Sequence, residues 1–258
     1  MKILVISPYI PWPLYSGSSV RIFNLSKQMS LKGHKVFLLF GQNNEAVDIN
    51  IDFLNFYEKI YTYKIPTLKH IFFIIYSVFS PKIYPAVKFQ SNNFKEVLNN
   101  ILSEEKIDVI WACFSFMADM LPDYLNKKMP VILDQHESER LVYYGYLKNG
   151  NLKQKIFAII NILKLKKFEE KVFSKINILV SVSKEESIVA HKYVKQGIKF
   201  LTVPNGVDES FFTDLNLFLN KKDIVVFCAN MAVRRNIEAA NWFVKRIFPN
   251  IKEKIPDV

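Results

Sequence analysis

Cysteine and glycine are scarce in this sequence, and long hydrophobic runs are missing. The two cysteines, Cys113 and Cys228, form no C-x-x-C pair, which excludes a disulfide framework and a cysteine-based zinc site. With only 7 glycines and 11 prolines, the chain is not collagen-like or a flexible low-complexity polymer. The longest apolar stretch, residues 71–79, is far shorter than the roughly 18 residues that a membrane-spanning helix needs.

A secretory signal is missing as well. Lys2 is followed by only four apolar residues before Ser7 and Pro8, whereas the apolar core of a signal peptide is longer. We therefore expect a cytoplasmic protein that is at most peripheral at the inner face of a membrane.

What the chain does contain is typical of a folded α/β protein. Half of its 258 residues are apolar and 14% are aromatic, which is enough to bury one large core or two smaller ones. Its 35 lysines and arginines exceed its 24 acidic residues and give a net charge of +11. This composition excludes an intrinsically disordered chain.

Strand-like and helix-like segments alternate along most of the chain, which favours a doubly wound parallel sheet. Strands are expected at residues 3–6, 35–40, 108–112, 131–133, 178–182 and 201–203. Helices are expected to begin at Ser18 and Ser19 and end at Gly33, and to cover residues 68–79, 93–102 and 185–194. We assign residues 1–206 to this domain.

The pattern changes after Pro204. Residues 207–222 are polar and are expected to be a linker, followed by a strand at 223–229 and a helix at 236–254. One strand and one helix cannot bury their own apolar faces. Residues 223–258 are therefore expected to be the first unit of a second, truncated α/β domain.

The loop after the first strand leads to a helix N-terminus. Ser16, Gly17 and Ser18 lie there, where free backbone N–H groups favour an anion. Arg21 in the first turn opposes the helix dipole unless an anion lies nearby. A ligand phosphate and an ordinary solvated arginine explain Arg21 equally well. No Walker loop and no G-x-G-x-x-G fingerprint is present.

A second charged cluster follows the strand at 131–133. Residues 134–140 contain five ionisable side chains, among them Asp134, His136 and Glu137. Ligands of open parallel sheets bind beyond the carboxyl ends of the strands, so a functional site is favoured over a merely solvated loop. The other three histidines are interpreted as structural. A serine hydrolase is not favoured, because no G-x-S-x-G elbow occurs.

A basic segment covers Lys148–Lys175, with eight lysines and two glutamates. Apolar residues interleave at helical spacing, so the segment can form an amphipathic helix on an anionic membrane. A long domain helix with a soluble lysine face is the competing interpretation. No nucleic-acid-binding module accompanies the charge, and a nucleic-acid partner is not expected.

Several motifs together resemble glycosyltransferase family 4. They are Met1–Tyr9, Pro11-Trp12-Pro13, Ser16-Gly17-Ser18 with Arg21, the turn Gly33-His34, Val180–Ser183 with Glu186, Val203–Asp208, and Asn236–Ala240 with Trp242-Phe243. The segment Val203–Asp208 is the most specific match. The resemblance extends in order along the whole chain.

This resemblance implies a GT-B architecture and a retaining transfer of sugar from a nucleotide-sugar to a glycan or a lipid-linked acceptor, as in cell-surface polysaccharide synthesis. It implies no metal and no cofactor besides the donor substrate. His136 would act as the catalytic residue at the transferred sugar. Substrate would be bound by Ser16, Gly17, Ser18, Arg21, Asp134, Glu137, Asn205 and Gly206.

The chain also departs from the family. Ser18 and Ala229 stand where glycine is usual, and the E-x7-E motif is missing because Arg246 lies eight residues after Glu238. The resemblance therefore implies that these residues are inactive alone, since the donor half is missing. The alternative is a non-catalytic membrane-surface or partner-binding module that retains the fold. A GT-B-like epimerase is a third, less favoured possibility.

Overall fold

The computed structural model describes residues 1–43, 51–193, 197–208, 223–231 and 233–256. The chain divides into two compact units, Met1–Gly206 and Val207–Val258. Each unit is described by itself below.

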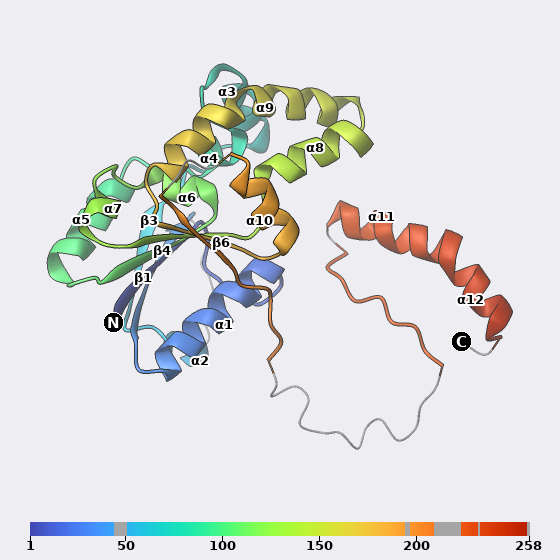
Figure 1. Cartoon of the computed structure of the whole chain (residues 1–258), viewed down its shortest axis with the longest axis horizontal. Coiled ribbons are helices and arrows are strands. Elements are labelled where there is room, and N and C mark those ends of the chain that lie inside the picture. The colour runs from blue at the N-terminus through green and yellow to red at the C-terminus, as the bar shows by residue number, and fades with distance from the viewer. Residues whose placement is uncertain (44–50, 194–196, 209–222, 232, 257–258) are drawn as a thin grey trace. The chain divides into compact units, whose positions relative to one another are not determined.

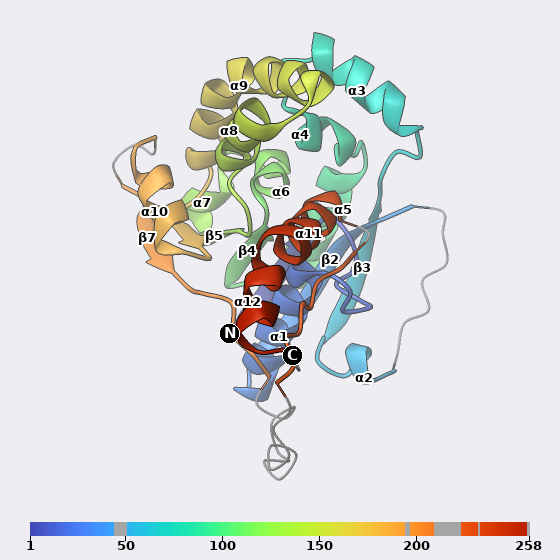
Figure 2. The same ribbon diagram turned by 90° about the vertical axis from the view of Figure 1, so that its right-hand side faces the viewer.

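The first unit contains a parallel sheet of seven strands in the order β3-β2-β1-β4-β5-β6-β7 (Figures 1 and 2). The strands are β1 (Lys2–Ser7), β2 (Lys35–Gln42), β3 (Lys59–Lys64), β4 (Val109–Cys113), β5 (Val131–Gln135), β6 (Ile178–Ser181) and β7 (Lys199–Thr202). Every neighbouring pair is parallel. The predicted fold class, a doubly wound α/β sheet, is confirmed.

Helices cover both faces of the sheet (Figure 1). They are α1 (Gly17–Leu31), α2 (Ile51–Leu54), α3 (His70–Phe79), α4 (Tyr84–Lys88), α5 (Phe94–Glu104), α6 (Ser115–Met120), α7 (Leu125–Lys128), α8 (Glu139–Asn149), α9 (Leu152–Phe173) and α10 (Lys184–His191). Alternate side chains of a strand point to opposite faces. In β1, Ile3 and Val5 accordingly enter the core beneath α1, while Leu4 and Ile6 enter the core beneath α5, α6 and α9.

Two local predictions in this unit differ from the structure. Helix α1 is capped by Ser16, whose Oγ accepts the backbone N–H of Ser19, rather than by Ser18 and Ser19. Strand β3 was not predicted from the sequence, because most of its side chains are only partly covered at the sheet edge. The predicted end of α1 at Gly33 is confirmed, since that glycine has a φ of 82°.

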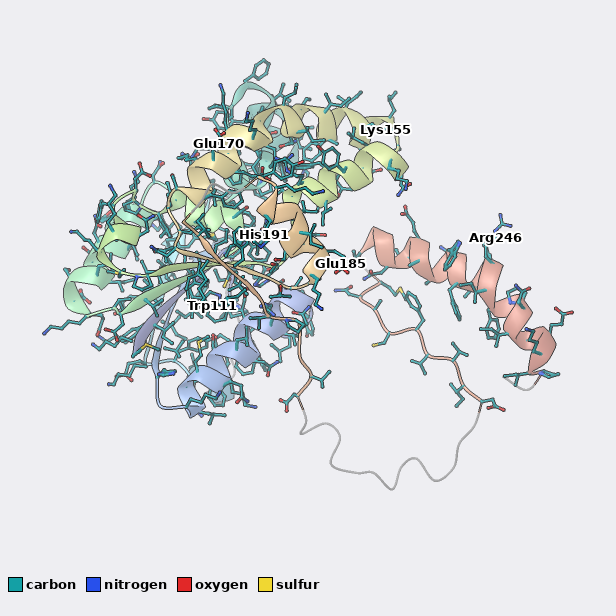
Figure 3. All side chains as sticks on the ribbon, in the orientation of Figure 1. Trp111, Lys155, Glu170, Glu185, His191 and Arg246 are labelled. Atoms are coloured by element: carbon teal, nitrogen blue, oxygen red, sulfur yellow. The ribbon has the colours of Figure 1, made fainter. Side chains whose placement is uncertain are left out.

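The described part of the second unit contains helix but no strand. A continuous helical segment includes α11 (Arg234–Trp242), the π-helical turn η3 (Phe243–Ile247) and α12 (Phe248–Lys254), and Arg246 marks it in Figure 3. The helix predicted at 236–254 is confirmed. The strand predicted at 223–229 is wrong: these residues form no strand, and Ile224 and Val226 are exposed. An apolar run becomes a strand only where another strand pairs with it. Most of the predicted linker lies outside the described residues.

Candidate functional site

The candidate site lies at the point where the strand order reverses. Strand β1 is placed between β2 and β4, so connections leave the carboxyl ends of β1 and β4 in opposite directions. Such a switch point is the usual ligand crevice of an open parallel sheet. Trp111 marks β4 within the sheet in Figure 3. The loop after β1, the loop after β4 and the end of β5 meet there, and we call this the switch-point site.

Asp134 is the electrostatic centre of the switch-point site. It is the fourth residue of β5, not a loop residue as predicted, and its side chain is 1% exposed. Arg21 donates from Nε at 2.9 Å and from Nη2 at 2.9 Å, and His136 Nε2 lies 3.1 Å from Oδ2. Burial opposes ionisation of Asp134, but the hydrogen bonds from His136 and Arg21 outweigh it and lower the pKa of the carboxyl.

Arg21 connects three parts of the chain. Besides Asp134, its Nη1 donates to the carbonyl of Pro204 at 3.3 Å and to Oδ1 of Asn205 at 3.2 Å. The protein thus supplies the negative charge that a cation in the first turn of α1 needs. Its position holds Asp134 and Asn205 in place, and a contact between Arg21 and substrate stays a prediction.

His136 has one nitrogen engaged and one without a partner. An ionised carboxylate only accepts hydrogen bonds, so Nε2 donates to Asp134 and Nδ1 is the ring nitrogen left over for another group. The side chain is 6% exposed, and within the described part of the chain no group is hydrogen-bonded to Nδ1. Buried polar atoms rarely stay unpaired. This nitrogen is the best-placed group for a ligand hydroxyl.

Phe114 forms the aromatic wall beside His136. The two ring centroids are 4.5 Å apart, and the centroid of the Tyr9 ring lies 6.2 Å from that of Phe114. Phe114 has a φ of 75°, a left-handed conformation that costs a non-glycine residue on the order of 1–3 kcal/mol and concentrates at functional sites. Its backbone N–H donates to the Asp134 carbonyl at 3.0 Å, which holds the strained residue in place.

Hydroxyl groups gather at the N-terminus of α1. The Tyr9 hydroxyl lies 2.5 Å from Ser18 Oγ, which lies 3.0 Å from Ser16 Oγ. Burial raises the pKa of Tyr9, so the phenol keeps its proton. Gly17 lies among these hydroxyls, and a Cβ added there would meet no atom within 4 Å. The protein itself therefore does not require glycine at this position.

An apolar cavity of about 760 Å³ adjoins the switch-point site. Glu137, Glu139 and Phe114 belong to its lining, together with side chains of α3, α4, α8 and α9. Ser115 Oγ donates a hydrogen bond to Glu139 Oε1, and Gln135 Nε2 donates to Oε2 at 3.4 Å. Burial nevertheless raises the pKa of Glu139 to about 7.

The structure brings together four predicted site residues, Arg21, Asp134, His136 and Asn205, through direct hydrogen bonds. Ser16, Gly17 and Ser18 join them through Tyr9 and Phe114. Glu137 lies on the adjoining cavity, and Gly206 is exposed at the end of the first unit and has no hydrogen bond that ties it to this network. Across the described residues, no group of three or more His, Cys, Asp or Glu side chains could hold a metal ion.

Tyr9, Phe114 and Glu139 were missed as site residues. The signal available for Glu139 was its place in the charged cluster after β5. Tyr9 and Phe114 follow strand ends, but nothing in their residue type indicated function.

The basic segment Lys148–Lys175 contains fewer free lysines than predicted. Lys171 pairs with Asp119, Lys175 is buried against the carbonyls of Asp119 and Leu121, and Lys164 donates to carbonyls of α3. The remaining five are exposed: Lys148, Lys153, Lys155, Lys166 and Lys167.

Helix α9 has an apolar stripe on its solvent side. Leu152, Ile156, Ile159 and Leu163 recur at helical spacing and are each at least half exposed. Exposed Lys155 and Glu170 mark the two ends of α9 in Figure 3. Helix α3, tied to α9 by Lys164, adds exposed apolar side chains and contains no Asp, Glu, Lys or Arg. None of the described helices is long and apolar enough to cross a bilayer.

No protein-family model and no curated protein matches the sequence. Among solved structures, sucrose-phosphate synthase from Thermosynechococcus elongatus matches with a TM-score of 0.52 at 10% identity, over 85% of this chain and 53% of that one. The likeness to the synthase establishes the fold. Apo UGT2 of Phytolacca americana has a TM-score of 0.48 at 11% identity, over 84% and 54%. Medicago truncatula UGT71G1 complexed with UDP-glucose has 0.46 at 11%, over 81% and 52%. The chain spans about half the length of these structures.

Proposed function

We propose that residues 1–206 form the acceptor side of a nucleotide-sugar-dependent glycosyltransferase, and that His136 contacts the transferred sugar. The observation that carries the proposal is the buried Nδ1 of His136 at the switch point, held by Asp134 and left without a partner in the described part of the chain. A sugar hydroxyl suits such a nitrogen, because a hydroxyl both donates and accepts hydrogen bonds.

Two further observations support this proposal. Motifs that resemble those of glycosyltransferase family 4 contribute residues to the switch-point site, since Ser16 caps α1, Gly17 and Ser18 begin it, and Asn205 is hydrogen-bonded to Arg21. The solved structure whose likeness establishes the fold of this chain, with a TM-score of 0.52, is that of a sucrose-phosphate synthase. Family 4 membership, the retaining outcome, independence from metal and a role in surface polysaccharide assembly are parts of the proposal.

In this proposal each group of switch-point residues has a separate role. The backbone N–H groups in the first turn of α1 and the hydroxyls of Ser16 and Ser18 stabilise the negative charge that gathers on the departing nucleoside diphosphate. Asp134 fixes the tautomer and orientation of His136, and Arg21 keeps Asp134 ionised in its buried position. Phe114 places an apolar wall beside the imidazole, which limits access of water.

Nuclear magnetic resonance of the labelled histidine side chains tests this proposal. UDP-glucose, UDP-N-acetylglucosamine and GDP-mannose are titrated into the chain up to high millimolar concentration, because the acceptor side by itself is expected to bind a donor weakly, with UDP and GDP alone as controls for the nucleotide. We expect at least one nucleotide-sugar to shift the His136 resonances more than its free nucleotide does, while those of His34 stay unchanged. If His136 responds to none of them, the proposed contact with the transferred sugar is refuted.

The apolar stripe of α9 favours a second function, reversible association with an anionic membrane. Lys155, Lys166 and Lys167 are exposed beside the stripe, and a lysine near such a surface contributes on the order of 1 kcal/mol. This arrangement, with apolar residues flanked by cations, is typical of helices that lie on a bilayer.

Sedimentation with vesicles tests the membrane proposal. The chain should bind vesicles with 30% phosphatidylserine and not purely zwitterionic ones, and binding should weaken with salt. Replacing Lys166 and Lys167 by Gln should release it. The same change at exposed Lys127 and Lys128 of α7 serves as the matched control. Equal binding to both vesicle types, or equal effects of both double variants, would refute the proposal.

A further inference from the structure

The cavity beside the switch-point site is built for an apolar molecule. Its volume of about 760 Å³ is within the range of small-molecule sites, roughly 300–1,000 Å³. Apolar and aromatic side chains dominate the lining, among them Ile74, Tyr84, Phe116, Val142, Tyr146 and Phe157. A sugar with several hydroxyls would find few hydrogen-bond partners on these walls, and an unpaired buried hydroxyl is unfavourable.

The carboxylates, the lysine and the glutamine of the cavity lie at the two ends of α8, and His70, Tyr84, Tyr143 and Tyr146 add further polar atoms to its lining. Glu139 begins α8 close to the carboxyl end of β5, whereas Lys153 and Gln154 lie beyond the last turn of that helix. The 11 residues of α8 separate these ends by about 16 Å at 1.5 Å per residue. An elongated ligand would thus place one end near Glu139.

The Glu139 end accepts a neutral hydroxyl better than an anion. Glu137 and Glu139 both line the cavity, and a phosphate or carboxylate close to them would be repelled. Each carboxylate oxygen accepts more than one hydrogen bond, so Glu139 can accept from a ligand hydroxyl in addition to Ser115 and Gln135.

This end of the cavity also adjoins the sugar-contacting histidine. Phe114 lines the cavity, and its ring centroid is 4.5 Å from that of His136. Phe114 thus belongs to both the cavity and the switch-point site, so a hydroxyl held by Glu139 lies in a space that adjoins the proposed sugar position.

We infer that the cavity binds the acceptor, and that the acceptor is an uncharged, apolar alcohol whose hydroxyl is hydrogen-bonded by Glu139. This inference rests on the proposed function for the word acceptor. The binding of an apolar alcohol depends only on the cavity and not on the proposed transferase activity. It selects a neutral lipid-like acceptor over a soluble glycan and over a lipid with a phosphate group at its reactive end.

Isothermal titration calorimetry with 1-decanol, at pH 8, tests the inference on the whole chain. We expect saturable binding with a negative heat-capacity change, because apolar surface leaves water. Decanoate, which has the same chain length and a negative end, should bind at least tenfold more weakly. Equal affinity for decanol and decanoate would contradict the role given to Glu139, and no saturable binding of decanol would overturn the inference.

Two cavity-filling variants locate the binding. Ile74→Trp on α3 and Val142→Trp on α8 fill the cavity from two different helices, and each should weaken decanol binding at least tenfold. Ile75→Trp is the matched control, because Ile75 is 49% exposed and does not line the cavity. Melting curves identify a variant that fails to fold, in which case the other decides. Wild-type affinity in the folded filled variants would place the decanol elsewhere and refute the inference.

The outcomes separate this inference from the proposed function. Decanol binding in the cavity without a response of His136 to any nucleotide-sugar would keep the site and refute the transferase. A response of His136 without decanol binding would keep the transferase and refute the apolar acceptor.

Discussion

Replacing Glu139 by Gln should change how the stability of the first unit depends on pH. The carboxyl is half-buried against apolar side chains, and its pKa is raised from 4.5 to about 7. Burial is the largest cause, and the negative charge of Glu169 adds to it, while hydrogen bonds from Ser115 and Gln135 act in the opposite direction.

The sign follows from proton binding. Between pH 4.5 and 7 the folded protein holds a proton on Glu139 that the unfolded chain releases, so the free energy of unfolding falls as pH rises through this window. At roughly 1.4 kcal/mol per pH unit, the wild type loses about 3 kcal/mol that a neutral glutamine does not lose. The amide of the glutamine variant keeps an oxygen that accepts from Ser115, and its NH2 group can donate to the side-chain oxygen of Gln135 once the Gln135 amide has turned over.

Urea denaturation at pH 4 and pH 8 measures this effect. The stability difference, variant minus wild type, should be about 3 kcal/mol more favourable to Glu139→Gln at pH 8 than at pH 4. Glu137→Gln is the control, because Glu137 is an exposed neighbour and surface substitutions usually change stability by less than about 0.5 kcal/mol. A difference that stays constant between the two pH values would refute the buried, protonated state of Glu139.

Two further predictions concern the frame of the switch-point site. Arg21→Ala leaves the buried Asp134 carboxylate with only His136 and should cost about 3–5 kcal/mol in urea denaturation at pH 7; a loss below about 1 kcal/mol would show that the pair is not buried in solution. Ser16→Ala removes the cap of α1 and should cost about 1 kcal/mol in the same assay. Ser18→Ala should lower the free energy of unfolding by less than Ser16→Ala does. A larger loss for Ser18→Ala would show that Ser18, as predicted from the sequence, caps α1.

Much of the sheet could be predicted because its signal is local. The apolar runs of β1 and β2 are long enough to indicate strands covered on both faces, and Gly33 indicates the end of α1. Local patterns failed where pairing decides. The run at 223–229 has the composition of a strand but no neighbour to pair with in the described structure, and the edge strand β3 has a neighbour but a weak pattern.

The candidate site was predictable in its location but not in its contacts. His136 and Asp134 could be placed at a strand end from their neighbours in the sequence. The pairing of Arg21 with Asp134 could not, because 113 residues separate them and either could have faced solvent. The left-handed backbone of Phe114 had no signal either, since glycine is the residue that usually indicates this conformation.

The most direct test of the central claim compares two glycine substitutions. Gly17 at the start of α1 and Gly145 in α8 both have open space around an added Cβ, so either change to Ala should leave the first unit folded and at most about 1 kcal/mol more stable. If a nucleotide-sugar binds at the N-terminus of α1, the new methyl group at Gly17 blocks its close approach.

Isothermal titration with UDP-glucose, UDP-N-acetylglucosamine and GDP-mannose is therefore performed on the wild type and both variants. We predict that at least one nucleotide-sugar binds the wild type weakly, as expected of the acceptor side by itself, that Gly17→Ala weakens this binding at least tenfold, and that Gly145→Ala does not change it. Equal affinity in all three proteins, or no binding to the wild type, would contradict the assignment of the switch-point site to a nucleotide-sugar.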